Sequence, residues 1–262
     1  MLKFDAFIRK NVDIPFSVKQ KVFEAAVLSS ILYGCESWLT KNLSTVKTSY
    51  MHCVKSLLSV RKTTPSDTCL IEAGLPTLSE RVCTIQKNCY TKLLVERDHS
   101  EDDPLTHVWS IVSRANTPGA RYINAVIGSD PTSERKKLKD RLLESEKSRY
   151  ITYRSEMNPE LCVHPMYKNL SVAEHERIVA TRIRLSSHNL AIEKGRWSRI
   201  PRERRLCSCG QVQTENHILS ECPDTASIRA LHPSVTFEIP MFFQEETLLM
   251  CKLCAKMTKD YV

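Results

Sequence analysis

The feature that most constrains this chain is a run of metal-ligating residue types near its C-terminus. Cys207, Cys209, His217 and Cys222 fall within sixteen residues, in the order Cys-x-Cys-x7-His-x4-Cys. Zinc binds four such ligands in a tetrahedron, and a set of three cysteines and one histidine leaves no coordination position open. The pattern therefore predicts a structural Zn²⁺ site that keeps a small module folded, and it argues against a catalytic centre.

The residues around these ligands are suited to folding them together. Gly210 allows the backbone to turn sharply directly after the first two cysteines. Thr214 can cap a short helix that carries His217 in its first turn, and Pro223 prevents further helix after Cys222. The alternative is three ordinary buried thiols, because reduced cysteine often packs as a small apolar side chain.

Composition predicts a mainly α protein. The 262 residues include only 6 glycines but 42% hydrophobic residues, which favours long helices over turn-rich sheet. The 11 cysteines are odd in number and follow no secretory signal, so a reducing compartment fits better than a disulfide framework. The longest apolar run, around residues 23–35, is too short to span a bilayer. We expect an intracellular protein, nuclear or cytoplasmic, that does not associate with membranes.

Residues 1–100 are predicted to form an N-terminal helical bundle. Apolar residues recur at helical spacing, and Gly34 and Gly74 are placed to end helices. Any apolar face left exposed on these helices would support self-association. The helices are expected from Ser17 to the break at Gly34, over 43–58, between Pro65 and Gly74, and from Leu78 to about Leu93.

Residues 101–165 are predicted to be an acidic linker followed by a charged connector helix over 133–149. The Asp102-Asp103 pair could suggest the metal ligands of a polymerase. No β-branched or aromatic hairpin flanks it and Pro104 follows, so a solvated acidic loop is the better interpretation. Residues 166–262 are predicted to be a basic helical region that contains the zinc module.

Basic residues are concentrated directly before the metal ligands. Between positions 177 and 205, nine Lys or Arg stand against two Glu, a net charge of +7 out of +8 for the whole chain. Ser171 and Glu174 have the form of a capping box that begins a helix. That helix carries Arg177, Arg182 and Arg184 within a turn or two of each other, so they could form a basic ridge. Arginine with tryptophan can bind phosphate and stack on a base. The predicted nucleic-acid-binding residues are Arg182, Arg184, Arg196, Trp197, Arg199, Arg202, Arg204 and Arg205.

Two features have a simpler alternative. Trp197 could pack against the zinc module while the neighbouring arginines are merely exposed. Cys251 and Cys254 have the spacing of half a metal site, but no second ligand pair lies near them in the sequence. Because free cysteine is so often buried, we interpret these two as core thiols.

Two stretches resemble a known family. Residues 31–38, Ile-Leu-Tyr-Gly-Cys-Glu-Ser-Trp, resemble the segment that follows the polymerase core in LINE-type (non-LTR) retrotransposon reverse transcriptases. The stretch from Gly195 through the four metal ligands to Pro223, with Glu215, is similar to the Cys-Cys-His-Cys motif near the C-terminus of those polyproteins. The resemblance implies a C-terminal fragment with thumb-like helices and a zinc module that helps hold RNA or target DNA.

The sequence therefore predicts a non-catalytic, nucleic-acid-binding remnant of a retrotransposon polyprotein. The palm carboxylates of a polymerase and the residues of an endonuclease are not found in this chain. Neither are the motifs of zinc hydrolases or deaminases, so we expect no enzyme activity. The alternative is a helical protein-interaction or structural module in which zinc only ties helices together.

Overall fold

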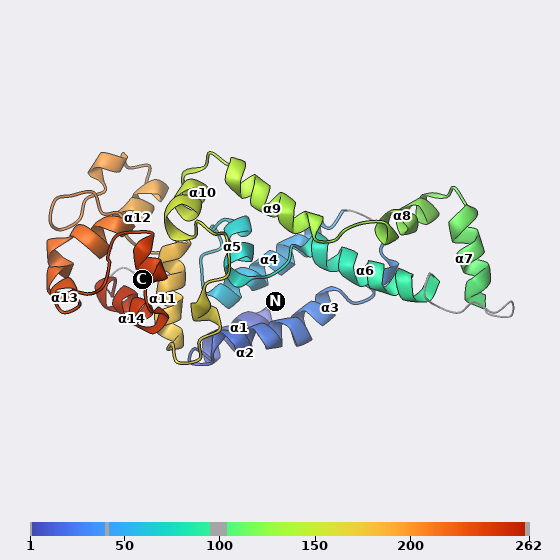
Figure 1. The fold of residues 1–262 in the computed structure, drawn as a ribbon, viewed down its shortest axis with the longest axis horizontal. Helices are drawn as coiled ribbons and strands as arrows, with labels where there is room; N and C mark the ends of the chain where they lie inside the picture. Colours follow the sequence, from blue (N-terminus) through green and yellow to red (C-terminus); the bar gives the residue numbers. More distant parts are fainter. Residues whose placement is uncertain (1, 40–41, 95–103, 260–262) are drawn as a thin grey trace.

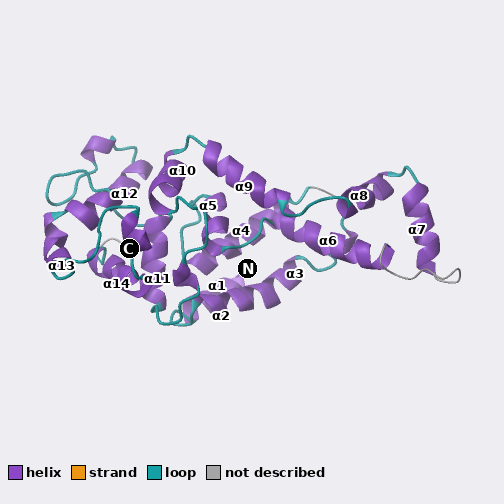
Figure 2. Cartoon of the chain, in the orientation of Figure 1, coloured by secondary structure: helices purple, strands orange, loops and turns teal. Residues whose placement is uncertain are grey.

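The computed structural model describes residues 2–39, 42–94 and 104–259. Within those ranges the regular structure is helical and no strand forms, which confirms the predicted mainly α class (Figure 2). An isolated bridge between Leu206 and Val212 is antiparallel. None of the described helices combines the length and apolar character needed to cross a membrane.

The helices follow one another with short connections. In the first half of the chain they are α1 (Leu2–Lys10), α2 (Phe16–Val22), α3 (Ser29–Ile31), α4 (Ser44–Leu58), α5 (Ser66–Ala73), α6 (Leu78–Leu94), α7 (Pro104–Arg114) and α8 (Pro118–Ile127). In the second half they are α9 (Ser133–Glu144), α10 (Ser148–Thr152), α11 (Glu174–Arg184), α12 (Ala191–Trp197), α13 (Ala226–Ala230) and α14 (Thr247–Met257). Turns of π-helix cover Phe23–Leu28, Tyr153–Met157 and His217–Glu221, and 3-10 turns cover Cys35–Ser37, Pro165–Tyr167, Arg202–Arg204, Pro223–Thr225 and Met241–Gln244.

Helix ends that depend on glycine are where the sequence predicts them. A continuous helical run from Phe16 to Ile31 stops before Gly34, which has a φ of 66°. Gly74 ends α5 with a φ of 67°, and its amide donates to the carbonyl of Ile71. Left-handed backbone at these positions is available to glycine without steric cost, so the two stops are local properties of the chain.

Three local predictions need correction. The capping box is wrong, because Ala173 precedes α11 and the Glu174 carboxylate is buried in ion pairs instead. The connector helix ends at Glu144, since Ser145 is extended and a separate helix begins at Ser148. Helices α1, α7 and α8 were not predicted. The acidic pair Asp102-Asp103 lies outside the described residues.

One hydrophobic cluster runs through most of the chain. Its buried members extend from Phe4 in α1 to Met257 in α14, so this core crosses the boundary predicted between residues 165 and 166. A small second cluster around Tyr90 and Val126 joins α6 to α8. Figure 1 shows α6, α7 and α8 projecting from the rest of the molecule, at the end opposite α12 and α13.

Charged side chains are buried where α11 crosses the core. Glu174 accepts hydrogen bonds from Lys19 Nζ at 2.8 Å and from both Nε and Nη2 of Arg177 at 2.8 Å. The Arg177 guanidinium also lies over the Phe16 ring, 5.0 Å from its centroid. Buried charges are stable only when they are paired and hydrogen-bonded, so this cluster fixes the position of α2 against α11.

A second buried ion pair joins α5 to α11. Arg184 Nε and Nη2 donate to the two carboxylate oxygens of Glu72 at 2.6 and 3.2 Å. The hydroxyls of Tyr153 and Tyr167 donate to the same carboxylate at 2.7 and 3.1 Å. Burial alone raises the pKa of Glu72, but the charge and hydrogen bonds of Arg184, with the bond from Tyr153, lower that pKa below its usual value.

Candidate metal centre and adjoining basic surface

A tight turn brings the first two candidate ligands together. The Cys207 amide donates to the Gln211 carbonyl at 2.7 Å, and the Gly210 amide donates to the Cys207 carbonyl at 2.9 Å. Gly210 has a φ of 86°, a conformation that residues with a β-carbon adopt only with strain. Cys207 and Cys209 therefore lie in one tight turn, which Gly210 and these two backbone hydrogen bonds close.

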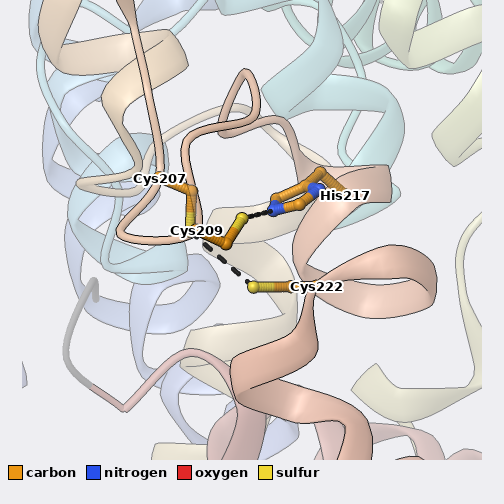
Figure 3. A group of neighbouring side chains, drawn as sticks. All are labelled: Cys207, Cys209, His217 and Cys222. Atoms are coloured by element: carbon orange, nitrogen blue, oxygen red, sulfur yellow. Dashed lines mark hydrogen bonds between the residues drawn. The ribbon is translucent and has the colours of Figure 1, made fainter.

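The other two ligands flank the turn of π-helix after Thr214. The Thr214 hydroxyl accepts a hydrogen bond from the His217 amide at 3.0 Å, as the sequence predicts for a capping residue. The Cys222 amide donates to the His217 carbonyl at 2.7 Å, and Cys222 is extended where Pro223 follows. This short helical segment presents both side chains to the preceding turn (Figure 3).

The four side chains converge. Their ligand atoms all lie within 4.8 Å of one another. The Cys207 and Cys222 sulfurs are 3.7 Å apart, and the Cys209 sulfur is 3.2 Å from His217 Nε2 (Figure 3). In a tetrahedral zinc site with Zn–S bonds of about 2.3 Å and a Zn–N bond of about 2.0 Å, ligand atoms are about 3.5–3.8 Å apart. The sulfur–sulfur distance and the sulfur–nitrogen distance are within about 0.3 Å of those values, and the cluster could hold a metal ion.

The histidine leaves one ring nitrogen unexplained by protein contacts. His217 Nδ1 is buried and has no hydrogen-bond partner among the described residues. It lies 3.7 Å from a carboxylate oxygen of Glu221, one turn further on. A metal-ligating histidine usually carries its proton on the other nitrogen, directed at a carboxylate or carbonyl. Nε2, which faces the Cys209 sulfur, is therefore the atom that could bind a metal ion, and Nδ1 is the atom that could direct its proton toward Glu221.

The thiols are electrostatically prepared for a cation. Burial raises the pKa of Cys207, but hydrogen bonds from Ser208, the Cys209 amide, His217 and Cys222 outweigh burial and lower it. Burial and the neighbouring charge of Cys207 raise the pKa of Cys222. A bound metal ion would stabilise both thiolates.

Glu215, a residue of the motif that is not a ligand, anchors the module to the core. Its buried carboxylate accepts a hydrogen bond from His188 Nε2 at 2.8 Å. His188 Nδ1 in turn accepts from the Leu190 amide at 3.3 Å, which leaves the ring proton on Nε2. No sequence pattern links His188 to Glu215, because only the fold brings these two residues together.

Arg184 is not part of an exposed basic ridge, contrary to the sequence prediction. Its side chain is 2% exposed and is used entirely by the buried pair with Glu72 and by the Met157 carbonyl. Arg182 is half-buried, and its Nε donates to the Ser59 carbonyl at 2.8 Å. Helical spacing places these arginines near each other, but packing of α11 against α14 and α5 directs Arg184 inward.

Two arginines of the predicted stripe also make internal contacts. Arg196 Nε lies 3.1 Å from the buried carboxylate of Glu193, which also accepts hydrogen bonds from Arg149. Arg205 donates to the carbonyls of Ile192 and Ile200 at 2.8 and 2.9 Å. The Arg205 contacts join the segment just before Cys207 to α12, and the Arg196 contact lies within α12. Both side chains therefore contribute to the fold.

Trp197, Arg199, Arg202 and Arg204 remain on the surface. The Trp197 side chain is 50% exposed, and the three arginines are exposed as well. Arg61, which the sequence did not single out, lies over the Trp197 ring with its guanidinium carbon 4.1 Å from the centroid. The indole is therefore held by a cation on its ring and is half open to solvent.

Cys251 and Cys254 are core thiols, as predicted. Both are fully buried in α14. The Cys251 sulfur lies 3.9 Å from the sulfur of Met166, and the Cys254 sulfur lies 3.8 Å from that of Met250. Burial raises the pKa of Cys254 well above its usual value, which keeps this thiol protonated and inert.

The described residues thus form a mainly helical protein with a Cys3His cluster that could hold a metal ion. Comparison with protein-family models, with curated proteins and with solved structures finds no match to this chain.

Proposed function

We propose that this protein is a non-catalytic nucleic-acid-binding protein. The observation that carries the proposal is the exposed group formed by Trp197, Arg199, Arg202 and Arg204, between α12 and the metal cluster. Within the described ranges, none of these three arginines forms an ion pair. Free guanidinium groups bind phosphate through charge-assisted hydrogen bonds, and an exposed indole offers a face on which a base can stack.

We further propose that the cluster holds a structural Zn²⁺ ion. Three thiolates and one imidazole in a tetrahedron match zinc's preferred ligands and leave no position for substrate or water. The role of the metal is to hold the arginine-bearing segment in a fixed position beside α12. The protein itself supplies the phosphate contacts.

Metal content tests the zinc assignment. Cys222→Ser should lower bound zinc from about one ion per chain to a small fraction, because three ligands no longer close the site. Cys162→Ser changes an exposed thiol outside the cluster and serves as the control. Limited proteolysis should then cut the Cys222 variant after Arg196 while the N-terminal helices stay protected. Equal zinc content in both variants would refute the assignment.

The origin that fits these features best is a C-terminal fragment of a LINE-type retrotransposon polyprotein. Two features support it: the order of the ligands after Gly195-Arg196-Trp197, and the segment around Gly34. In that setting the helices before the metal cluster are thumb-like and the polymerase chemistry belongs to a part not contained in this chain. Binding of RNA or DNA is then what this fragment retains.

Binding measured across a salt series tests the function. Zinc-loaded protein is titrated into labelled single-stranded RNA and into duplex DNA, and log Kd is plotted against log salt. Each phosphate contact contributes about 0.7 to this slope for a single strand and about 0.9 for a duplex. Replacing Arg199, Arg202 and Arg204 together by glutamine should therefore reduce the slope by about 2 to 3.

A matched variant controls for net charge. Arg114, Arg121 and Lys136 are exposed on α7, α8 and α9, and their replacement by glutamine removes the same charge. This control should bind almost as the unmodified protein does. If folded, zinc-loaded protein fails to bind at low salt, or if both variants change the slope equally, the proposal is refuted. The protein is then better described as a helical interaction module.

A further inference from the structure

Two hollows adjoin each other along one face of α4. The first has a volume of about 470 Å³ and the second of about 450 Å³, and both are lined by His52, Lys55 and Lys62. The first hollow extends along α4 over Ser44 and Lys47. Lining residues of α4 recur every three or four positions, so they share one side of the helix. We call these two hollows together the α4 groove.

The α4 groove is strongly basic. Its first hollow is lined by Lys47, Lys55, Lys62 and His52, with no acidic side chain among its lining residues. The second hollow adds further cationic residues of α1, α2 and α11 and contains one carboxylate, that of Asp5. Asp5 is already bound by His52 Nε2 at 2.7 Å and by the Ser56 hydroxyl at 2.5 Å. Lys19 is used by its buried pair with Glu174, and Lys55 Nζ donates to the Lys62 carbonyl at 2.8 Å. The exposed cations Arg9, Lys47 and Lys62 are therefore the ones available to an anionic ligand.

Two consecutive residues join this groove to the surface beside the metal cluster. Lys62 lines both hollows, whereas Arg61 covers the ring of Trp197. The Arg61 guanidinium is also held by the side chain of Asn189, and its amide donates to the Ser187 hydroxyl at 2.9 Å. The loop after α4 thus places Lys62 where the two hollows meet and the neighbouring Arg61 on the half-open indole, so one loop joins the two surfaces.

We propose that the α4 groove and the group around Trp197 form one continuous track for the phosphate backbone of a single-stranded nucleic acid. This inference rests on the proposed function and adds the path that the ligand takes. From Ser44 to Lys55 the helix rises about 16 Å at about 1.5 Å per residue. A strand stacked as in a B-form helix, with phosphates about 3.4 Å apart along its axis, would place about five of them over that distance, and a more extended strand fewer.

The chemistry of the lining favours phosphates over an acidic protein segment. Lys47 and Lys62 are exposed, and Ser44, Thr48 and Ser66 line the same hollow, where the Thr48 hydroxyl donates to the Ser44 carbonyl at 3.2 Å. Cations beside hydroxyl groups suit a ligand that carries one charge and several acceptor oxygens at every step. The half-open indole that Arg61 contacts offers a face on which a base can stack.

The test compares short and long single-stranded RNA. Lys47→Gln with Lys62→Gln removes two groove charges, and Arg121→Gln with Lys136→Gln is the matched control on α8 and α9. Lys55 is retained because its Nζ donates to the Lys62 carbonyl at 2.8 Å. On an RNA of about 16 nucleotides the groove variant should lower the salt slope by about 1.4, whereas an RNA of about four nucleotides should bind unchanged.

A measurement without substitutions checks the same inference. Amine-reactive labelling of Lys47 and Lys62, read by peptide mass spectrometry, should be reduced several-fold by the long RNA, whereas labelling of Lys136 should not change. If the long RNA protects neither lysine and the groove variant behaves as its control, the track is refuted.

The failure of this inference is distinguishable from that of the proposed function. Loss of RNA binding in the variant of Arg199, Arg202 and Arg204, with a groove variant that binds normally, would overturn the track alone. Absence of RNA binding by the unmodified protein would overturn both. If the groove variant keeps RNA but loses binding to an immobilised polyglutamate peptide, the groove is a surface for acidic protein segments and the inference is wrong.

Discussion

Replacing Glu72 by glutamine removes the charge partner of a guanidinium that has no access to water. Arg184 and Glu72 are 2% and 0% exposed as side chains, and two hydrogen bonds join them. Glutamine has nearly the same volume and keeps one oxygen, which can accept from one of the Tyr153 and Tyr167 hydroxyls, because these donate to different carboxylate oxygens. The substitution therefore tests the missing charge and not a cavity.

The expected loss of stability is about 3–5 kcal/mol, the usual cost of leaving one member of a buried ion pair without its partner. In a chain of this size, each 1 kcal/mol shifts the melting temperature by roughly 2–4 °C. The variant should therefore melt roughly 6–20 °C below the unmodified protein. Adding Arg184→Met should recover at least half of the loss, because the uncompensated charge is then gone.

Urea unfolding of zinc-loaded protein, followed by circular dichroism, measures these differences. Glu134→Gln provides the control, since Glu134 pairs with Lys137 at 2.7 Å in a partly exposed position. Exposed pairs contribute about 0–1 kcal/mol. A loss in the Glu72 variant no larger than in this control would refute the argument that the buried pair holds α5 against α11.

Acid pH gives a second test of the same pair. The pKa of Glu72 is lower in the folded protein than its ordinary value of 4.5, so its contribution to stability is present above that value and is lost as pH falls through the folded pKa. The difference in unfolding free energy between the unmodified protein and Glu72→Gln should be constant at neutral pH. It should shrink as pH falls below 4.5. A difference that stays constant on acidification would contradict the assigned cause.

Three further predictions concern the region around the metal and the turn after α5. Arg205→Gln should lower stability by about 1–3 kcal/mol because two carbonyls lose their donor, whereas Arg204→Gln should change it by less than about 0.5 kcal/mol; urea unfolding compares them. Gly74→Ala should cost at least about 1 kcal/mol, since φ is 67° and the new β-carbon would lie 2.6 Å from Val163 Cγ2. Gly128→Ala is the control, because its new β-carbon would lie at an ordinary 3.5 Å from the Asn124 carbonyl oxygen and should be tolerated. Thermal melts of the two variants compare them. Removing the metal with a chelator should increase amide hydrogen exchange over residues 205–225 and leave α4 unchanged, and uniform protection would count against a metal-held module.

The metal cluster could be predicted from the sequence because its parts are local. Sixteen residues contain all four ligands, and the backbone features that bring them together are Gly210, Thr214 and Pro223. Each acts through its own φ angle, hydroxyl or ring, with no distant partner required. The same holds for the helix stops at Gly34 and Gly74, whose left-handed backbone the fold retains.

The arginines could not be sorted in this way. Arg182 and Arg184 lie two positions apart in α11, yet only Arg184 forms an ion pair with a carboxylate. That carboxylate, of Glu72, lies on α5. The contact of Arg61 with Trp197 likewise joins residues that are remote in sequence. Helical periodicity tells which side chains share a face, but it does not tell which face another helix will cover.

The sequence by itself therefore determined the helical class and the position of a four-ligand cluster, since both follow from local backbone preferences and side-chain chemistry. The tertiary structure decided which basic residues are consumed by the core and which remain on the surface. The physical reason is that a charge can be buried only where the fold supplies an opposite charge and hydrogen-bond partners. For Arg184 the partner is Glu72, and for Arg199 and Arg204 the described residues supply no ion pair.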